Sequence, residues 1–168
     1  MKTRLFLLIM LIVSCISCES NETLSEQEKD KIKGEIKEVV NTMFKGCEKA
    51  NFEMTIEAIL DSPDFIFLIN GITYSYQEFV DAVEPKFSLL SDQKVTIIDE
   101  RYSILDKSTV LYTTNCTFLE NYKDGHSSFN DPTAILCIYK KINNEWKAIY
   151  AVESYVKKSI ENEGLVTE

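Results

Sequence analysis

The chain has few of the residues that most often build metal and phosphate sites. Its 168 residues include one histidine, five glycines and three prolines. A structural or catalytic zinc site draws its ligands mainly from histidine and cysteine, and a phosphate-binding loop needs clustered glycines. With one histidine and scattered glycines, we predict neither a metal site nor a cofactor.

The chain also lacks an apolar run long enough to cross a membrane. The uncharged apolar run 5–13 follows Lys2 and Arg4, and it is far shorter than the roughly 20 residues that a membrane-spanning helix needs. A basic start, a short apolar core and small residues after it are typical of a secretory signal that is removed on export. The cysteines that follow make this segment resemble a bacterial lipoprotein signal.

Cys15 and Cys18 are the two candidates for lipidation. Residues 12–15, Ile-Val-Ser-Cys, match the lipobox of that family at every position. Residues 15–18, Cys-Ile-Ser-Cys, match it less well at the first position but give a more usual signal length and a polar mature start. We favour Cys18 over Cys15, with ordinary secretion as the alternative. The resemblance implies a lipid anchor at the bacterial cell envelope, in the periplasm or at the cell surface.

The remaining chain has the size of one domain. We predict a signal peptide, a tether, a folded domain and a tail over residues 1–17, 18–24, 25–160 and 161–168. The signal holds two of the 18 basic residues and none of the 27 acidic ones, so its removal changes the net charge from −9 to −11. Such an acidic surface disfavours phosphate backbones and anionic lipid. We therefore expect no nucleic-acid partner, and membrane contact only through the lipid anchor.

Three capping signals mark helix starts before residue 90. They are Ser25 with Glu28, Asn51 by itself, and Ser75 with Glu78. In each case a side-chain oxygen can satisfy backbone amides that the first helical turn leaves free. Apolar residues between positions 32 and 47 then follow one stripe of a helix. Pro85 is expected to end or kink the third helix.

The rest of the chain has the alternating pattern of strands. Asn70-Gly71 is the pair that a two-residue hairpin turn prefers, and it separates two short apolar segments. From residue 93 onwards we predict four long strands, over 94–105, 108–121, 128–142 and 145–156.

This order of elements resembles the nuclear transport factor 2-like superfamily, in particular its SnoaL-like polyketide cyclase branch. The local marks are residues 61–80 and the segment Asn-Asn-Glu-Trp-Lys-Ala-Ile-Tyr-Ala-Val-Glu-Ser at 143–154. The second is similar to the family's closing Trp-Lys-x-x-x-x-His-x-Ser strand. The resemblance implies an α+β cone, in which a strongly bent antiparallel sheet wraps around three N-terminal helices and leaves a pocket. The superfamily includes isomerases, dehydratases, epoxide hydrolases and members with no known reaction.

Turn positions allow the pocket face of the sheet to be predicted. A two-residue turn at Asn143-Asn144 places Ile135 opposite Val152, and one at Asp124-Gly125 places Tyr112 opposite Cys137. Directly opposed residues share a face. A slip of one residue would exchange every assignment. The more aromatic face supplies the candidate ligand-binding residues, which are Tyr112, Thr114, Tyr139, Tyr150, Val152 and Ser154. The tyrosines are open to a second interpretation, as core aromatics.

No catalytic set is predicted. The family's closing strand often has a histidine where this chain has Val152, and His126 falls beside the Asp124-Gly125 turn. Acid–base catalysis would then need a tyrosine or a carboxyl with a raised pKa. The nearest acids, which we interpret as surface carboxylates, are Glu53, Asp64, Glu120 and Asp131.

Two functions remain open at this point. The favoured one is a non-catalytic, envelope-tethered module that binds a small apolar or amphipathic ligand or an envelope protein. The alternative is an isomerase-, dehydratase- or cyclase-type enzyme that uses tyrosine and carboxylate proton transfer, and a buried acid beside the pocket tyrosines would favour it. Leu136, Ile138 and Ile149 make the outer sheet face partly apolar, which predicts a homodimer that packs sheet against sheet.

Overall fold

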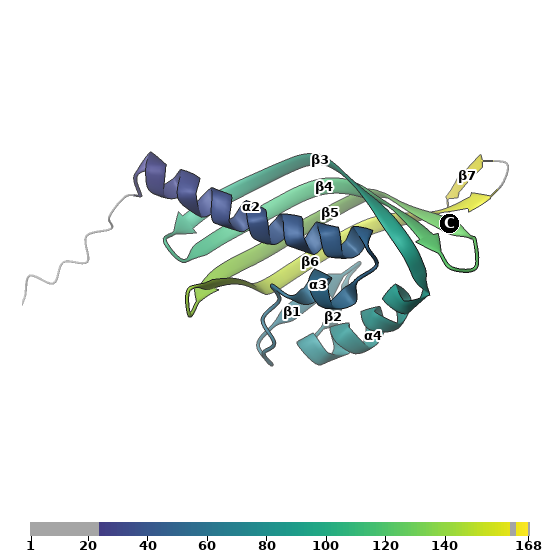
Figure 1. Cartoon of the computed structure of the whole chain (residues 1–168), viewed down its shortest axis with the longest axis horizontal. Coiled ribbons are helices and arrows are strands. Elements are labelled where there is room, and N and C mark those ends of the chain that lie inside the picture. Colours follow the sequence, from purple (N-terminus) through teal and green to yellow (C-terminus); the bar gives the residue numbers. More distant parts are fainter. Residues whose placement is uncertain (1–23, 162–163, 168) are drawn as a thin grey trace, which may run out of the picture.

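A computed structural model describes residues 24–161 and 164–167. Its elements are α2 (Glu26–Glu48), α3 (Phe52–Ile56), β1 (Ile66–Ile69), β2 (Ile72–Tyr74), α4 (Tyr76–Leu89), β3 (Leu90–Asp106), β4 (Thr109–Tyr122), β5 (Ser127–Ile142), β6 (Glu145–Glu161) and β7 (Gly164–Thr167). Helix α2 lies across the concave side of a long curved sheet (Figure 1). On the β6 side of the sheet, α3, α4, β1 and β2 gather together. The predicted α+β class is confirmed. The predicted signal peptide and both candidate lipidation sites lie outside the described residues.

The predicted helix starts are confirmed by their capping bonds. The backbone amide of Ser25 donates to Glu28 over 2.9 Å, and the amide of Met54 donates to Oδ1 of Asn51 over 2.9 Å. None of the helices in residues 24–161 is long and apolar enough to span a bilayer.

Pro85 does not end α4, which continues to Leu89. The proline lies in the last part of the helix, where its missing amide removes only one bond from the ladder. Beyond it, the ring of Phe87 packs edge-on against Phe52 with centroids 5.4 Å apart. This aromatic contact favours the extra turn.

The sheet has the strand order β2-β1-β6-β5-β4-β3, with β7 paired to β6. All pairs are antiparallel except β1 with β6. Two of the three predicted two-residue turns are present, at Asn70-Gly71 and Asn143-Asn144, and all four residues have the positive φ angles that such turns require. The third, at Asp124-Gly125, is wrong, because β4 ends at Tyr122 and β5 begins at Ser127, and of these two turn residues only Gly125 has a positive φ. Strand β6 runs beyond its predicted end, and the predicted tail contains β7.

The predicted register is only partly right in both hairpins. Between β4 and β5 it holds from Tyr112 to Cys116 and then shifts by one residue before Phe118. Near the turn Tyr139 faces Ala148 as predicted. Ile149 is then an extra residue, so that Ile135 faces Glu153 and not Val152. Such a β-bulge exchanges the two faces of every residue after it. The face predicted for Tyr150, Val152 and Ser154 is therefore wrong.

The neighbours of Ala148 explain where the bulge forms. Its backbone amide donates to the carbonyl of Ala58 over 2.7 Å, and its carbonyl accepts from the amide of Leu60 over 3.0 Å. The loop after α3 thus pairs with β6 at this one point, and β1 takes over as the neighbour of β6 from Tyr150 onwards. The strand accommodates the change of partner with one additional residue.

The core lies between α2 and the inner sheet face. The buried residues of α2 form one stripe, and the strand residues in the same cluster include Val110, Tyr112, Cys116, Cys137, Tyr139 and Trp146. Full burial of one such side chain stabilises a fold by about 1.5–3 kcal/mol. Trp146 also donates from Nε1 to Oε2 of Glu35 over 2.7 Å, and Lys141 donates to the same oxygen. These bonds fix α2 to the β5–β6 hairpin.

Gly46 allows α2 and α3 to approach closely. A Cβ atom at this position would lie 2.5 Å from the backbone nitrogen of Thr55, which is too close for any other residue without a shift of the backbone. The contact places Cys47 and Thr55 side by side in the wall of the cavity described next.

Candidate functional site

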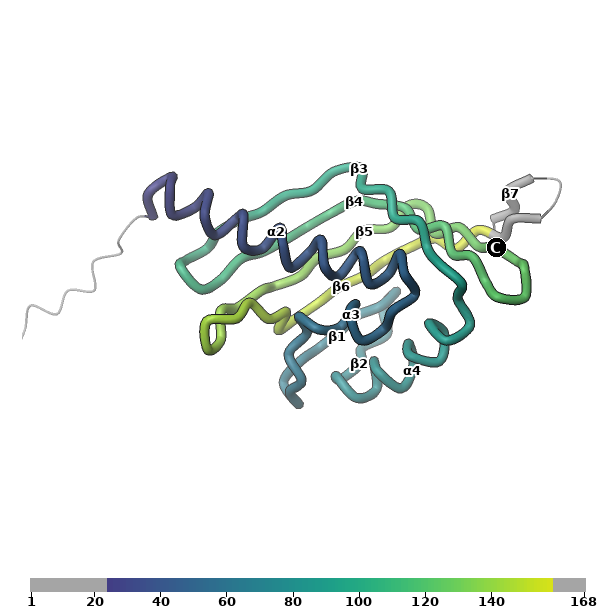
Figure 2. Tube along the Cα trace, in the orientation of Figure 1, coloured from purple at the N-terminus to yellow at the C-terminus, as the bar shows by residue number. Residues whose placement is uncertain are grey.

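A cavity of about 450 Å³ opens inside the cone, within the range of roughly 300–1,000 Å³ that is typical of small-molecule sites. The residues that line it come from the end of α2, from α3 and α4, and from strands β1 to β6. Figure 2 traces the course of these elements. Its walls are mostly apolar, and their aromatic residues are Phe44, Phe52, Phe67, Phe79, Phe87, Phe118, Tyr74, Tyr122 and Tyr155. A ligand there would meet rings on most sides.

Glu153 of β6 points into this cavity because of the bulge at Ile149. Burial is the main cause that raises the pKa of its carboxyl to about 7, and the negative charge of Glu120 acts in the same direction, against an opposite effect of Lys86. The backbone on both sides is fixed by Asn70, whose amide donates to the Glu153 carbonyl and whose Oδ1 accepts from the amide of Tyr155, each over 2.9 Å. A rigid strand therefore holds a carboxyl that can gain or lose a proton near neutral pH.

Glu120 of β4 is a second acid in the cavity wall, and three donors converge on it. The hydroxyls of Tyr122 and Ser128 donate to Oε2 over 2.8 and 2.6 Å, and Nδ2 of Asn130 donates to Oε1 over 3.1 Å. Carboxylate oxygens that accept from three donors fit the ionised form, which has no proton of its own to give. Burial raises the pKa of Tyr122 to about 12, so its hydroxyl stays a donor at neutral pH.

None of the six residues predicted to bind a ligand lines the cavity. Tyr112, Thr114 and Tyr139 do face inward, but they are buried in the core beneath α2. Tyr150, Val152 and Ser154 lie on the outer face because of the bulge. The structure therefore does not bring the three candidate tyrosines together at this cavity. Tyr112 and Tyr139 fit the alternative interpretation as core aromatics.

The four acids interpreted as surface carboxylates divide into two groups. Glu53 and Asp64 are exposed, and Asp131 pairs with Lys158 over 2.9 Å. For Glu120 the interpretation is wrong, since it lies half-buried in the cavity wall. Glu153 was not predicted as a site residue, because a β5–β6 register without a bulge places it on the outer face of the sheet. No local signal in the sequence marks the bulge.

The thiols offer no catalytic alternative. Cys47, Cys116 and Cys137 are buried and free. Burial raises the pKa of each thiol to about 12, so that all three are protonated at neutral pH and are poor nucleophiles. Within the described residues, no group of three or more His, Cys, Asp or Glu is arranged to hold a metal ion.

Several solved structures are similar to this one over most of the chain. A putative scytalone dehydratase from Novosphingobium aromaticivorans is 5% identical, with a TM-score of 0.71 over 85% of this chain and 97% of its own. The hexachlorocyclohexane dehydrochlorinase LinA-type3 from Novosphingobium barchaimii is 14% identical, with 0.65 over 86% and 100%. A nuclear transport factor 2-like superfamily protein from Salmonella enterica is 15% identical, with 0.67 over 81% and 99%.

The fold is the nuclear transport factor 2-like cone. No family model matches the sequence, and no curated protein matches it either. At such low identities the likeness establishes the fold alone. The chemistry must therefore be inferred from the cavity that this chain forms with its own residues.

Proposed function

We propose that this protein is a SnoaL-like lipoprotein of the bacterial envelope, whose cone transfers protons on a small, mostly apolar molecule. The observation that carries the proposed chemistry is Glu153, a carboxyl with a pKa of about 7 in an apolar cavity. A group with a pKa near the working pH can serve as base in one step and as acid in the next. The reaction class is isomerisation, dehydration or a related elimination.

The side chains of the cavity suggest a division of roles. Glu153 takes a proton from a substrate carbon. Tyr155 lies two residues further on the same face of β6 and also lines the cavity. Its hydroxyl can donate to an oxygen on which negative charge develops, since burial raises the pKa of Tyr155 and keeps it protonated. Glu120 stays in place through its three hydrogen bonds.

Two of the structural neighbours are named as a dehydrochlorinase and a putative scytalone dehydratase. Loss of hydrogen chloride and loss of water both require a proton to leave the substrate. These names support the proposed reaction class but identify no substrate for this chain.

A non-catalytic binding module is the second candidate. No described side chain donates a hydrogen bond to the Glu153 carboxyl, so nothing but the backbone orients it. Under this alternative the cavity holds a small amphipathic ligand and passes no proton.

The proposal is tested with 5-nitrobenzisoxazole, a small aromatic compound whose ring opens when a base removes one proton. The proton goes to the base, the nitrogen–oxygen bond breaks, and a coloured phenolate forms. The rate should rise with pH around a midpoint near 7, and Glu153→Gln should abolish the enhancement. An equal rate in Glu153→Gln and the parent protein would refute proton transfer by this residue. Glu38→Gln, which changes an exposed acid of α2, is the matched control.

A further inference from the structure

Asn130 of β5 presents an unused acceptor to the cavity. The residue is 6% exposed and lines the cavity wall. Its Nδ2 donates to Oε1 of Glu120 over 3.1 Å. Because a carboxylate only accepts, this bond fixes the amide orientation and leaves Oδ1 free. Oδ1 is buried and has no hydrogen-bond partner among the described residues. Buried polar atoms are nearly always paired, so an orphan in a cavity wall points to a bound donor.

The two carboxyls add to this surplus of acceptors. Glu120, Asn130 and Glu153 lie on the adjacent strands β4, β5 and β6, and all three line the same cavity. The nearby donors of Tyr122, Ser128 and Asn130 are already bound to Glu120. The cavity lysines, Lys86 and Lys157, are exposed residues. Tyr155 and Gln93 also line the cavity and can donate, but beside Glu120, Asn130 and Glu153 a ligand meets mainly acceptors and negative charge. This part of the wall therefore favours a ligand with donors and positive charge.

We propose that the cavity selects a small hydrophobic amine, whose protonated nitrogen donates to Oδ1 of Asn130 and to the carboxylates of Glu120 and Glu153. The aromatic walls would surround the hydrocarbon part. A buried charge needs an opposite charge and hydrogen bonds to be tolerated, and an ammonium group supplies both. The inference rests on the proposed function only in taking this cavity as the ligand site, because it requires no proton transfer from carbon.

The proposal also predicts that amine binding depends on pH, because Glu153 can be protonated or ionised. Glu153 faces the charges of Glu120 and Lys86, and Tyr155 follows it on the same face. A cation binds best when Glu153 is ionised. Affinity for an amine should therefore rise about tenfold or more from pH 5.5 to pH 8, as the carboxyl with a pKa of about 7 loses its proton.

Three probes of matched shape test the charge preference. They are 1-naphthylmethylamine, 1-naphthalenemethanol and 1-naphthoic acid, each titrated calorimetrically into the purified full chain, with detergent alone as the blank. We expect the amine to bind at least tenfold more tightly than the alcohol, and the acid to bind weakest. Glu153→Gln and Glu120→Gln should each weaken amine binding about tenfold and alcohol binding much less. Glu153→Gln should also remove the pH dependence. The control Glu38→Gln should behave as the parent protein.

The outcomes separate this inference from the proposed function. If the alcohol or the acid binds as tightly as the amine, amine selection is wrong, while the benzisoxazole rate still tests proton transfer by itself. If none of the three probes binds, the cavity is no ligand site of this kind, and the inference is overturned. If Glu120→Gln or Glu153→Gln melts well below the parent protein, the parent protein by itself decides. An amine that binds less than tenfold more tightly than the alcohol, or whose affinity does not change between pH 5.5 and pH 8, overturns the inference.

Discussion

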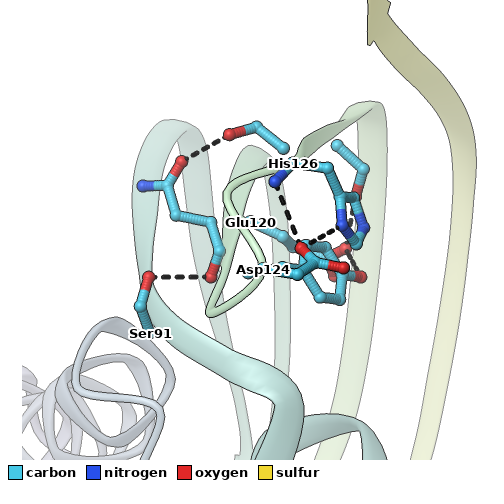
Figure 3. Close-up of polar contacts among 8 residues, drawn as sticks. Ser91, Glu120, Asp124 and His126 are labelled. Carbon is cyan, nitrogen blue, oxygen red and sulfur yellow. Dashed lines mark hydrogen bonds and ion pairs between the residues drawn. The ribbon is translucent and has the colours of Figure 1, made fainter.

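The imidazole of His126 stacks on the ring of Tyr122, with centroids 4.0 Å apart and planes 13° from parallel. His126 is exposed at the tip of the β4–β5 hairpin, as predicted, and it pairs with Asp124 in the same turn (Figure 3). The hydroxyl of Tyr122 donates to Glu120 in the cavity wall. The hairpin tip is thus linked to the site through one aromatic ring.

This stack predicts a positioning role for His126. His126→Ala should lower the rate of benzisoxazole opening by about three- to tenfold, because an aromatic pair stabilises its geometry by roughly 0.5–1.5 kcal/mol. His126→Phe keeps a ring that can stack but cannot titrate, and it should restore the rate. If His126→Phe is as slow as His126→Ala, the stacking of a ring on Tyr122 does not determine the rate.

Glu153 predicts a specific dependence of stability on pH. Its pKa is about 7 in the fold and 4.5 as the reference value, so the folded state binds more protons between these limits. Below pH 4.5 Glu153 is protonated in both states and its effect on the free energy of unfolding does not change with pH. As the pH rises from 4.5 towards 7, the free energy of unfolding should fall by up to about 3 kcal/mol. Urea unfolding at pH 5, 6, 7 and 8 measures the fall.

Glu153→Gln separates this effect from those of other acids. The variant should lack the fall and be more stable than the parent protein at pH 8. The lowered pKa values of Glu35 and Asp106 act in the opposite sense but at lower pH, below the reference values of 4.5 and 3.8. Parallel curves for the two proteins would contradict the raised pKa of Glu153.

Trp146→Ala should destabilise the domain by about 3–5 kcal/mol, as loss of a large buried aromatic does. The side chain is 6% exposed and lies in the core cluster. Trp146→Phe retains most of the packing but loses the bond to Glu35, and should cost about 1–2 kcal/mol. Chemical denaturation checks both, and a loss under about 1 kcal/mol for the alanine variant would contradict the packing described here.

The outer face of the sheet predicts a homodimer. The bulge adds Tyr150 and Val152 to Leu136 and Ile138 on this face, which makes it more apolar than the sequence pattern indicated. Ile138→Lys should convert a dimer into monomers, because it would bury an unpaired charge. Sedimentation of the chain from residue 19 onwards, at tens of micromolar, measures this, with the exposed Leu105→Lys as control. A monomer for the unmodified chain excludes a stable dimer.

Lipidation is predicted from residues 5–18 alone. Metabolic labelling with an alkyne fatty acid should tag the wild-type protein and fail when Cys15 and Cys18 are both changed to serine. Cys18→Ser by itself should already remove the label if Cys18 is the acylated residue. A labelled double variant would rule out both positions.

Local signals in the sequence were enough to predict most of the fold. The caps at Ser25 and Asn51 and the turn at Asn70-Gly71 depend on residues only a few positions apart, and all three are present. They mark the succession of helices and strands along the chain, on which the resemblance to the superfamily rests. The fold class could therefore be predicted without any knowledge of tertiary contacts.

The site could not be predicted in the same way. The face of Glu153 depends on the backbone bonds of Ala148 to Ala58 and Leu60, which are distant in sequence. The role of Glu120 depends on donors from the neighbouring strand, Ser128 and Asn130. Neither contact leaves a periodicity or a motif in the chain, so the acids were visible only as charges within strands.

Because of the extra residue at Ile149, a deletion or insertion of one residue at this point can change which side chains line the cavity, as a substitution can. Deletion of one codon there would shift β6 by one position and bring Val152 and Ser154 inward in place of Glu153 and Tyr155. The result would be a cavity without the Glu153 carboxyl, lined otherwise by the same residues. An alignment that reads across this point without a gap would compare inward with outward side chains from residue 150 onwards. Relatives that differ by one residue at this point could therefore be mistaken for active or inactive from their residue letters alone.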